Sequence, residues 1–156
     1  MAKERLQEEI KFEIENLDRL NDEMKQLLKR AGDNPTFVEV RAAGSILHDF
    51  YSGMEKILER IALSVDKSLP TGEEWHSELL SQMAKPVEGV REEILTDELL
   101  QKLKEYLRFR HLFRHIYGFE LKWERFKYLC VTMSDVLEGI KESIRNFFTE
   151  GWGYRE

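Results

Sequence analysis

The fold class is decided by residues 2–31, AKERLQEEIKFEIENLDRLNDEMKQLLKRA, whose pattern recurs along the chain. Apolar side chains recur there at steps of three or four residues, which places them on one face of a helix. The segment therefore predicts one long amphipathic helix, which the sequence Gly32-Asp33-Asn34-Pro35 ends. The recurring residues are Leu6, Ile10, Ile14, Leu17, Leu20, Met24, Leu27 and Ala31.

The same spacing predicts further long helices over residues 36–69, 99–117 and 121–148. The spacing of Thr71 and Glu74 is that of a capping box, which predicts a short helix to about residue 84. Thr96 is a candidate cap for the helix over 99–117. With no alternating strand pattern, we expect an all-α, up-and-down bundle of four main helices plus one short helix.

Two features of the expected helices concern their packing. Gly44 and Gly53 lie inside the second helical segment, where glycine lowers helix propensity, and they indicate close approach of a neighbouring helix. On the last segment, Phe126, Cys130 and Phe147 are expected to be buried packing residues.

Size and composition bound the class of protein. The chain has 156 residues, 18.6 kDa and 42% apolar residues, enough for one domain, which we place at 1–150 with a short tail at 151–156. No apolar run is long enough to span a membrane, and the N-terminus lacks the apolar segment of a signal peptide. Cys130 is the single cysteine, which excludes an intramolecular disulfide and favours a reducing, cytoplasmic location.

The charge distribution points to one local basic site. Net charge is −6, which is the wrong sign for a protein that coats nucleic acid through many Lys and Arg contacts. Within residues 106–117, YLRFRHLFRHIY, lie three arginines and two of the four histidines. Such a cluster can hold a phosphate, and histidine can transfer protons near neutral pH. These residues are Arg108, Arg110, His111, Arg114 and His115.

Two other interpretations of this segment stay open. Basic residues near the C-terminal end of a helix also complement its dipole. His111 and His115, four residues apart, could present two imidazoles to a metal, although no carboxylate or cysteine stands at a matching spacing there.

The segment resembles a known motif. Arg110, His111, His115 and Tyr117 match the HEPN superfamily signature of arginine, a polar residue, three variable residues and histidine, in the form with a tyrosine two residues further on. That form resembles the HepT-type toxins of HEPN/MNT type VII toxin-antitoxin pairs. Helix order and chain length are similar too, and residues 45–55 resemble an earlier helix of the family.

The resemblance implies a toxin that is a metal-independent endoribonuclease, cleaves cellular RNA with tRNA as one candidate, and needs no cofactor. It further implies a homodimer with its cleft at the two-fold interface, and an MNT-type nucleotidyltransferase antitoxin as partner. Arg110 and His115 would be the catalytic residues, His111 would orient them, and Arg108 and Arg114 would hold flanking phosphates. Tyr117 would be the hydroxyl that the antitoxin modifies with AMP.

Helix geometry bears on these roles. Arg110 and His115 are about 140° apart on a continuous helix, so either the helix distorts or two copies pair to bring them together. Tyr117, seven residues after Arg110, is within about 20° of the same helix face, so its phenol is expected along the arginine's side of the helix. We expect the RNA 2′-hydroxyl to be the nucleophile, with His115 as general base or acid and Arg110 stabilising the phosphorane charge. The products would be a 2′,3′-cyclic phosphate or its monophosphate and a 5′-hydroxyl, and DNA would not be cut.

Two alternatives to the toxin compete. One is a noncatalytic helical module that binds nucleotide or recruits a nucleotidyltransferase, and the other is a bundle that serves only oligomerisation. The intact Arg110 and His115 pair favours the ribonuclease, because a module that only binds has no need of both. His76, next to Trp75 in the short helix, has no evident partner in the sequence.

Overall fold

The computed structural model describes residues 2–151, with side chains up to Thr149. Helix α1 (Ala2–Ala31) has the predicted bounds, and it ends where Gly32 adopts a φ of 61°. Glycine reaches this left-handed conformation without the steric strain that a Cβ would cause. Leu6, Leu17 and Met24 are among the side chains that α1 buries, so the amphipathic prediction is confirmed.

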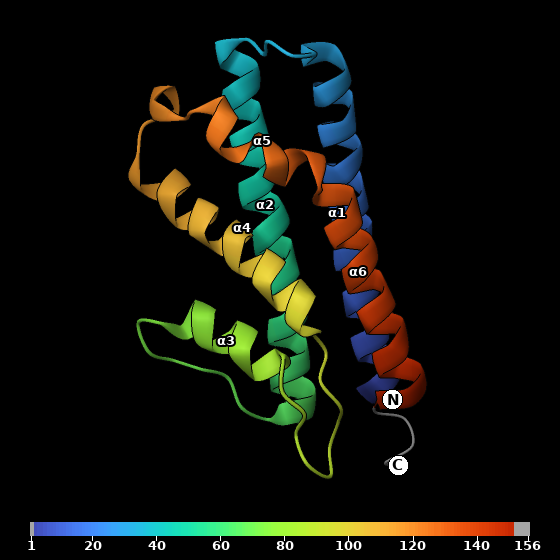
Figure 1. The fold of residues 1–156 in the computed structure, drawn as a ribbon. Helices are drawn as coiled ribbons and strands as arrows, with labels where there is room; N and C mark the ends of the chain where they lie inside the picture. The colour runs from blue at the N-terminus through green and yellow to red at the C-terminus, as the bar shows by residue number, and fades with distance from the viewer. Residues whose placement is uncertain (1, 152–156) are drawn as a thin grey trace.

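Helix α2 (Phe37–Ile61) returns along α1 (Figure 1). A capping box that sequence analysis did not identify starts it. The Glu39 N–H donates to Thr36 Oγ1 at 3.1 Å, and the Thr36 N–H donates to Glu39 Oε1 at 2.8 Å. A Cβ on Gly53 would lie 2.7 Å from Leu17 Cδ2 of α1. The close packing that this glycine predicted is therefore confirmed.

The short helix begins differently from the prediction. α2 continues as a π-helical turn, η1 (Ala62–Asp66), and then α3 (Trp75–Met83) follows a loop. The capping box predicted at Thr71 and Glu74 is not formed, because the helix starts at Trp75 and Glu74 itself holds the N-cap position without a side-chain hydrogen bond. Thr71 is thus too far from the first free amides of α3 to cap them.

The connection from α3 to the next helix is fixed by a buried arginine. Arg91 is 2% exposed, and its Nε and one terminal nitrogen donate to the two Asp66 carboxylate oxygens at 2.6 and 2.7 Å. Its remaining N–H groups reach the carbonyl oxygens of Gln82, Lys85 and Glu92 at 2.9 to 3.3 Å. An isolated bridge pairs Val87 with Arg91, and residues 2–151 contain no β-strand beyond it. The ion pair ties this loop to the end of η1.

The predicted last helix is divided. α5 (Trp123–Val131) and α6 (Met133–Asn146) are separated at Thr132, and η3 (Phe147–Gly151) follows α6. The Thr132 hydroxyl donates to the Tyr128 carbonyl at 2.7 Å, and the Tyr106 hydroxyl donates to the Leu129 carbonyl at 2.6 Å. The Tyr128 carbonyl also accepts the Thr132 N–H at 3.0 Å, whereas the Leu129 carbonyl accepts from a side chain of another helix, a bond that competes with the helical ladder where the chain turns. Figure 1 shows α5 crossing the end of the bundle and α6 descending beside α1.

The predicted all-α bundle is confirmed, with six α-helices among the described residues. Phe126, Cys130 and Phe147 are buried as expected, and burial raises the pKa of the Cys130 thiol to about 12. α6 is joined to α1 by Ser134 and Asn21, at 3.0 Å. The predicted tail lies outside the described residues except for Gly151, and no described helix has the length and apolar character needed to cross a membrane.

Candidate functional site

The helix that carries the predicted site is α4 (Asp97–His115). It begins where sequence analysis placed its cap, with the Leu99 N–H donating to Thr96 Oγ1 at 3.1 Å. It ends at His115, because Ile116 adopts an extended backbone with φ −128° and ψ 164°. Its last turn carries Arg114 and His115, so positive charge stands at the negative end of the helix dipole.

α4 separates the two predicted catalytic residues. It is a regular α-helix from Arg110 to His115, so the two side chains leave it about 140° apart. Arg110 is half-buried, whereas His111 and His115 are exposed. Of the two possibilities raised by the sequence, the helix does not distort. A single protomer therefore leaves Arg110 and His115 on different sides of α4.

A backbone acceptor fixes the orientation of His115. Its Nδ1 lies 2.7 Å from the carbonyl oxygen of His111. Because a carbonyl only accepts, Nδ1 carries the proton, and in the neutral ring Nε2 keeps its lone pair. The His111 ring packs against it, with ring centroids 4.3 Å apart and an interplanar angle of 33°. The result is an exposed imidazole with one nitrogen free to take a proton.

Arg110 projects toward α2. Its Nε is buried, and Arg110 has no hydrogen bond or ion pair with any other described residue. It interacts electrostatically with Tyr51 of α2, whose hydroxyl is also buried and lies beside the Glu55 carboxylate without hydrogen-bond geometry. Burial, and then Glu55, raise the pKa of Tyr51, and Arg110 opposes this shift. Each of the two helices therefore carries a buried donor without a hydrogen bond, Tyr51 Oη on α2 and Arg110 Nε on α4.

Sequence analysis missed the partner of His76. The His76 Nδ1 lies 2.6 Å from Glu55 Oε2, and the ring stacks on Trp75 with centroids 3.8 Å apart. Glu55 is buried, whereas the His76 side chain is 24% exposed. Burial and the Glu55 charge raise the pKa of Glu59, and the nearby His76 opposes them. Glu55 is 21 residues from His76, so no local spacing could have revealed the pair.

Tyr117 lies beyond the helix that was predicted to hold it. Its backbone is extended, with φ −77° and ψ 147°, and it precedes the short 3-10 helix η2 (Gly118–Glu120). The alignment with Arg110 along one helix face is therefore wrong, because α4 has already ended at His115. Tyr117 is 71% exposed, and its ring stacks parallel to Phe119 at 5.2 Å. Its phenol is accessible from solvent.

A further cation approaches the Tyr117 segment. The guanidinium of Arg41, an exposed residue of α2, lies so near Gly118 that a Cβ there would collide with it. A side chain at this position would require the exposed Arg41 side chain to move aside. The sequence contains no signal for Arg41, because residues so far apart meet only through the packing of α2 against η2.

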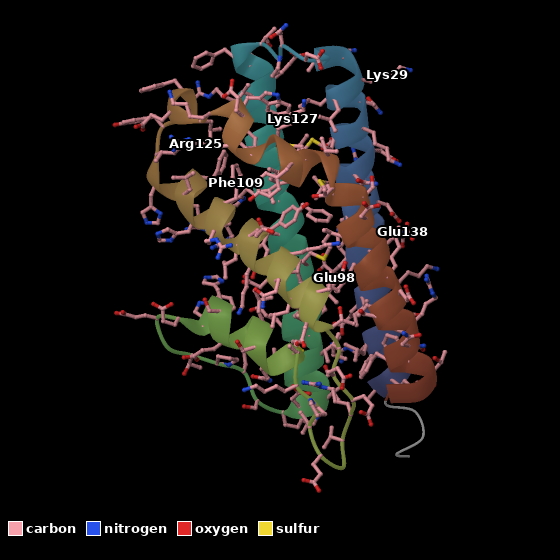
Figure 2. The ribbon with its side chains drawn as sticks, viewed as in Figure 1. Lys29, Glu98, Phe109, Arg125, Lys127 and Glu138 are labelled. Atoms are coloured by element: carbon pink, nitrogen blue, oxygen red, sulfur yellow. The ribbon has the colours of Figure 1, made fainter. Side chains whose placement is uncertain are left out.

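Arg108 lies in a groove between α4 and α5, away from Arg110. The groove has a volume of ≈ 320 Å³, and its lining includes Arg108, Lys122 and Arg125. Figure 2 labels Phe109 and Arg125, which line it from α4 and α5. None of these three cations forms an ion pair within the described part of the chain. Arg114 is exposed in the last turn of α4 and does not line this groove.

A metal site at His111 and His115 would need further ligands close by. His111 and His115 do lie side by side. Among residues 2–149, however, no group of three or more His, Cys, Asp or Glu is arranged to hold a metal ion.

The fold is an all-helical domain with an arginine and a histidine on one helix and an exposed tyrosine just beyond it, which is the arrangement of the HEPN-type motif in the sequence. Residues 42–150 match the family described as HepT-like protein, and this chain belongs to it. At the family level, HepT-like proteins are toxins related to ribonucleases and are typically paired with a nucleotidyltransferase antitoxin. No curated protein and no solved structure matches the chain significantly. The match runs from α2 to η3 and leaves α1 outside.

Proposed function

We propose that this protein is the toxin of a toxin-antitoxin pair and a metal-independent endoribonuclease of cellular RNA. The observation that carries the proposal is the hydrogen bonding of two side chains on α4. His115 has its Nδ1–H engaged and Nε2 free, and Arg110 has a guanidinium without a protein partner. A free imidazole nitrogen and an unpaired guanidinium are the groups that phosphodiester cleavage requires.

The proposed reaction uses the RNA 2′-hydroxyl as nucleophile. His115 acts as general base or acid, and Arg110 donates to the phosphate oxygens as negative charge develops there. The 2′ oxygen bonds to phosphorus and the bond to the 5′ oxygen breaks, which yields a 2′,3′-cyclic phosphate and a 5′-hydroxyl. We assign His111 to orienting His115, because the carbonyl of His111 accepts the Nδ1 proton and its ring packs against His115.

A homodimer is part of this proposal. Since Arg110 and His115 leave α4 about 140° apart, two copies related by a two-fold axis would supply both groups to one cleft. Pairing also doubles the local positive charge of a protein whose net charge is −6. Arg108 and Arg114 would bind flanking phosphates, and the groove with Lys122 and Arg125 gives Arg108 a path for the RNA strand.

Regulation by the antitoxin is proposed to act on Tyr117. Two observations support its phenol as an acceptor of AMP from an MNT-type nucleotidyltransferase. The side chain is exposed beyond the end of α4, and the Arg41 guanidinium lies near the next residue, Gly118. The added phosphate would bring negative charge and bulk to the RNA-binding face.

The test is cleavage of total RNA in EDTA by wild type, Arg110→Ala and His115→Ala, after intact mass has excluded modification. Arg19→Ala, an exposed arginine on α1, is the matched control and is expected to cleave as wild type does. Loss of cleavage in both site variants supports the nuclease. If the folded, unmodified wild type cleaves no RNA class, the noncatalytic module that binds nucleotide or recruits a nucleotidyltransferase takes its place.

A further inference from the structure

The groove between α4 and α5 has a rigid apolar floor. Buried side chains from both helices form it, Phe109 from α4 with Phe126 and Leu129 from α5. The Phe109 and Phe126 rings pack together with centroids 5.0 Å apart, so the floor is held in place by the core. The volume of ≈ 320 Å³ lies at the small end of the range for ligand sites. Such a groove suits one flat apolar group.

The walls of the groove expose an aromatic ring and a leucine. Tyr128 of α5 and Leu112 of α4 both line it, and each is 48% exposed. The Tyr128 hydroxyl donates to Glu105 Oε2 of α4 at 2.8 Å, which holds the ring in position. Unpaired RNA bases bind by stacking on aromatic side chains, because every base has a π-face. Tyr128 therefore offers a fixed surface for a base.

The rim of the groove carries more positive than negative charge. Three exposed cations lie there without an ion pair among residues 2–149: Arg108, Lys122 and Arg125. Two carboxylates also line the groove, and both already accept hydrogen bonds, Glu105 from Tyr128 and Glu120 from the Tyr117 N–H at 2.8 Å. The unpaired cations favour an anionic ligand. An anion joined to a flat ring is what a nucleotide presents.

The groove lies on the same side of α4 as His115. Residues three or four apart on a helix are neighbours on its surface. Leu112, which lines the groove, therefore lies next to His115, and Arg108 lies one turn before Leu112. A single chain forms the whole groove, so a two-fold dimer would carry it twice, each time beside a His115.

We propose that the groove between α4 and α5 binds one nucleotide of the RNA, next to the phosphate that is cleaved; this inference rests on the proposed ribonuclease function. The base leaves the stack of its own strand and packs on Tyr128 and the apolar floor. Its phosphate binds the cations of the rim. Because a duplex keeps its bases paired and stacked, the substrate class is single-stranded RNA or an unpaired loop. The groove thereby selects where the RNA is cut.

The test measures binding of RNA that cannot be cleaved. A 2′-O-methyl oligoribonucleotide of about six nucleotides keeps its bases and phosphates but has no free 2′-hydroxyl to act as nucleophile. Fluorescence anisotropy gives the affinity for the four homopolymers and for an abasic phosphodiester oligomer of the same length. Wild type should bind at least one homopolymer about 5-fold or more tightly than the abasic oligomer.

Two variants separate the base from the phosphate. Tyr128→Ala should weaken binding of the favoured homopolymer by about 5-fold or more, with abasic binding and salt dependence unchanged. Arg125→Ala should weaken binding of both oligomers and lower the slope of log affinity against log salt by about 0.7. Phe12→Ala and Arg19→Ala, at exposed residues of α1, are the matched controls and should bind as wild type does. Circular dichroism checks the fold of each variant.

The outcomes separate this inference from the function on which it rests. Equal binding of homopolymers and abasic oligomer by wild type, or folded Tyr128→Ala that binds as wild type does, overturns the nucleotide site and leaves the nuclease to the cleavage assay. Selective loss in Tyr128→Ala, with a wild type that cleaves no RNA, supports the nucleotide site and overturns the nuclease. Where RNA is cleaved, the cut sites should share the favoured base, and Tyr128→Ala should lose that preference.

Discussion

Two arginines of this protein, one buried and one half-buried, differ in their hydrogen-bond partners. The N–H groups of Arg91 all have acceptors, including both oxygens of Asp66, and the residue is 2% exposed. Arg110 is half-buried, and its Nε has no acceptor. A satisfied ion pair fixes a loop, whereas an unsatisfied guanidinium is available to an anionic substrate. We therefore assign Arg91 to stability and Arg110 to function, and four experiments test the distinction.

The largest effect is expected on stability from Arg91→Leu. This change leaves Asp66 buried without its partner, and breaking a buried ion pair costs about 3–5 kcal/mol. Urea unfolding followed by circular dichroism measures the loss of unfolding free energy. An exposed-site control, Arg125→Leu, should change the unfolding free energy by less than about 0.5 kcal/mol. A small loss of unfolding free energy for Arg91→Leu would contradict the assignment of Arg91 to stability.

Arg110→Ala is expected to affect activity instead. Removing one donor to a developing oxyanion lowers turnover by about 100- to 1000-fold, equivalent to about 2.7–4 kcal/mol. Its unfolding free energy should change by less than about 1 kcal/mol, since no protein partner is lost. Cleavage rate and urea unfolding are measured on the same preparation. Destabilisation as large as that of Arg91→Leu would mean that Arg110 serves the fold.

Alkaline pH tests the environment of Arg110 through Tyr51. Burial, and then Glu55, raise the pKa of Tyr51, so the folded state keeps a phenol proton that the unfolded chain loses above about pH 10. The resulting stability is complete below pH 10 and falls as pH rises. Between pH 8 and 11, wild type should lose about 1.4 kcal/mol more unfolding free energy than Tyr51→Phe. Equal losses would indicate that this phenol titrates normally.

The smallest effect on unfolding free energy is expected from substitution of the two buried tyrosines at neutral pH. The Tyr106 hydroxyl donates to the Leu129 carbonyl at 2.6 Å, so Tyr106→Phe should lower the unfolding free energy by about 1 kcal/mol. The Tyr51 hydroxyl has no hydrogen-bond partner, so Tyr51→Phe should leave stability nearly unchanged. Thermal unfolding at pH 7 gives both values. A larger loss for Tyr51→Phe than for Tyr106→Phe would reverse the assignment.

Local patterns predicted the helices well where the pattern was long. α1 and the Thr96 cap of α4 followed from apolar spacing and a single side-chain oxygen, which act within a few residues. The break at Thr132 was missed, because apolar spacing continues through it and Tyr106 of α4 supports the turn. The capping box at Thr36 and Glu39 was readable from sequence but was overlooked.

Some features of the candidate site were likewise predictable from local sequence, and others were not. Its basic helix and exposed histidines were visible as a cluster of residues 108–115. The direction of Arg110, the partner of His76 and the approach of Arg41 to Gly118 were not, because each depends on packing between elements distant in sequence. Tyr117 was placed wrongly along the helix, because helical-wheel geometry assumes that the helix continues.

The sequence by itself determined the helical class, the family motif and the concentration of basic residues on one helix, since periodicity and composition are local properties. Only the tertiary structure decided which basic side chains find hydrogen-bond acceptors within the protein. Arg91 and Arg110 carry the same charge, and although the motif singles out Arg110, no local pattern shows which acceptors each guanidinium meets in the fold. The difference arises from which buried acceptors the fold brings within hydrogen-bond distance, at Asp66 for Arg91 and at no described residue for Arg110.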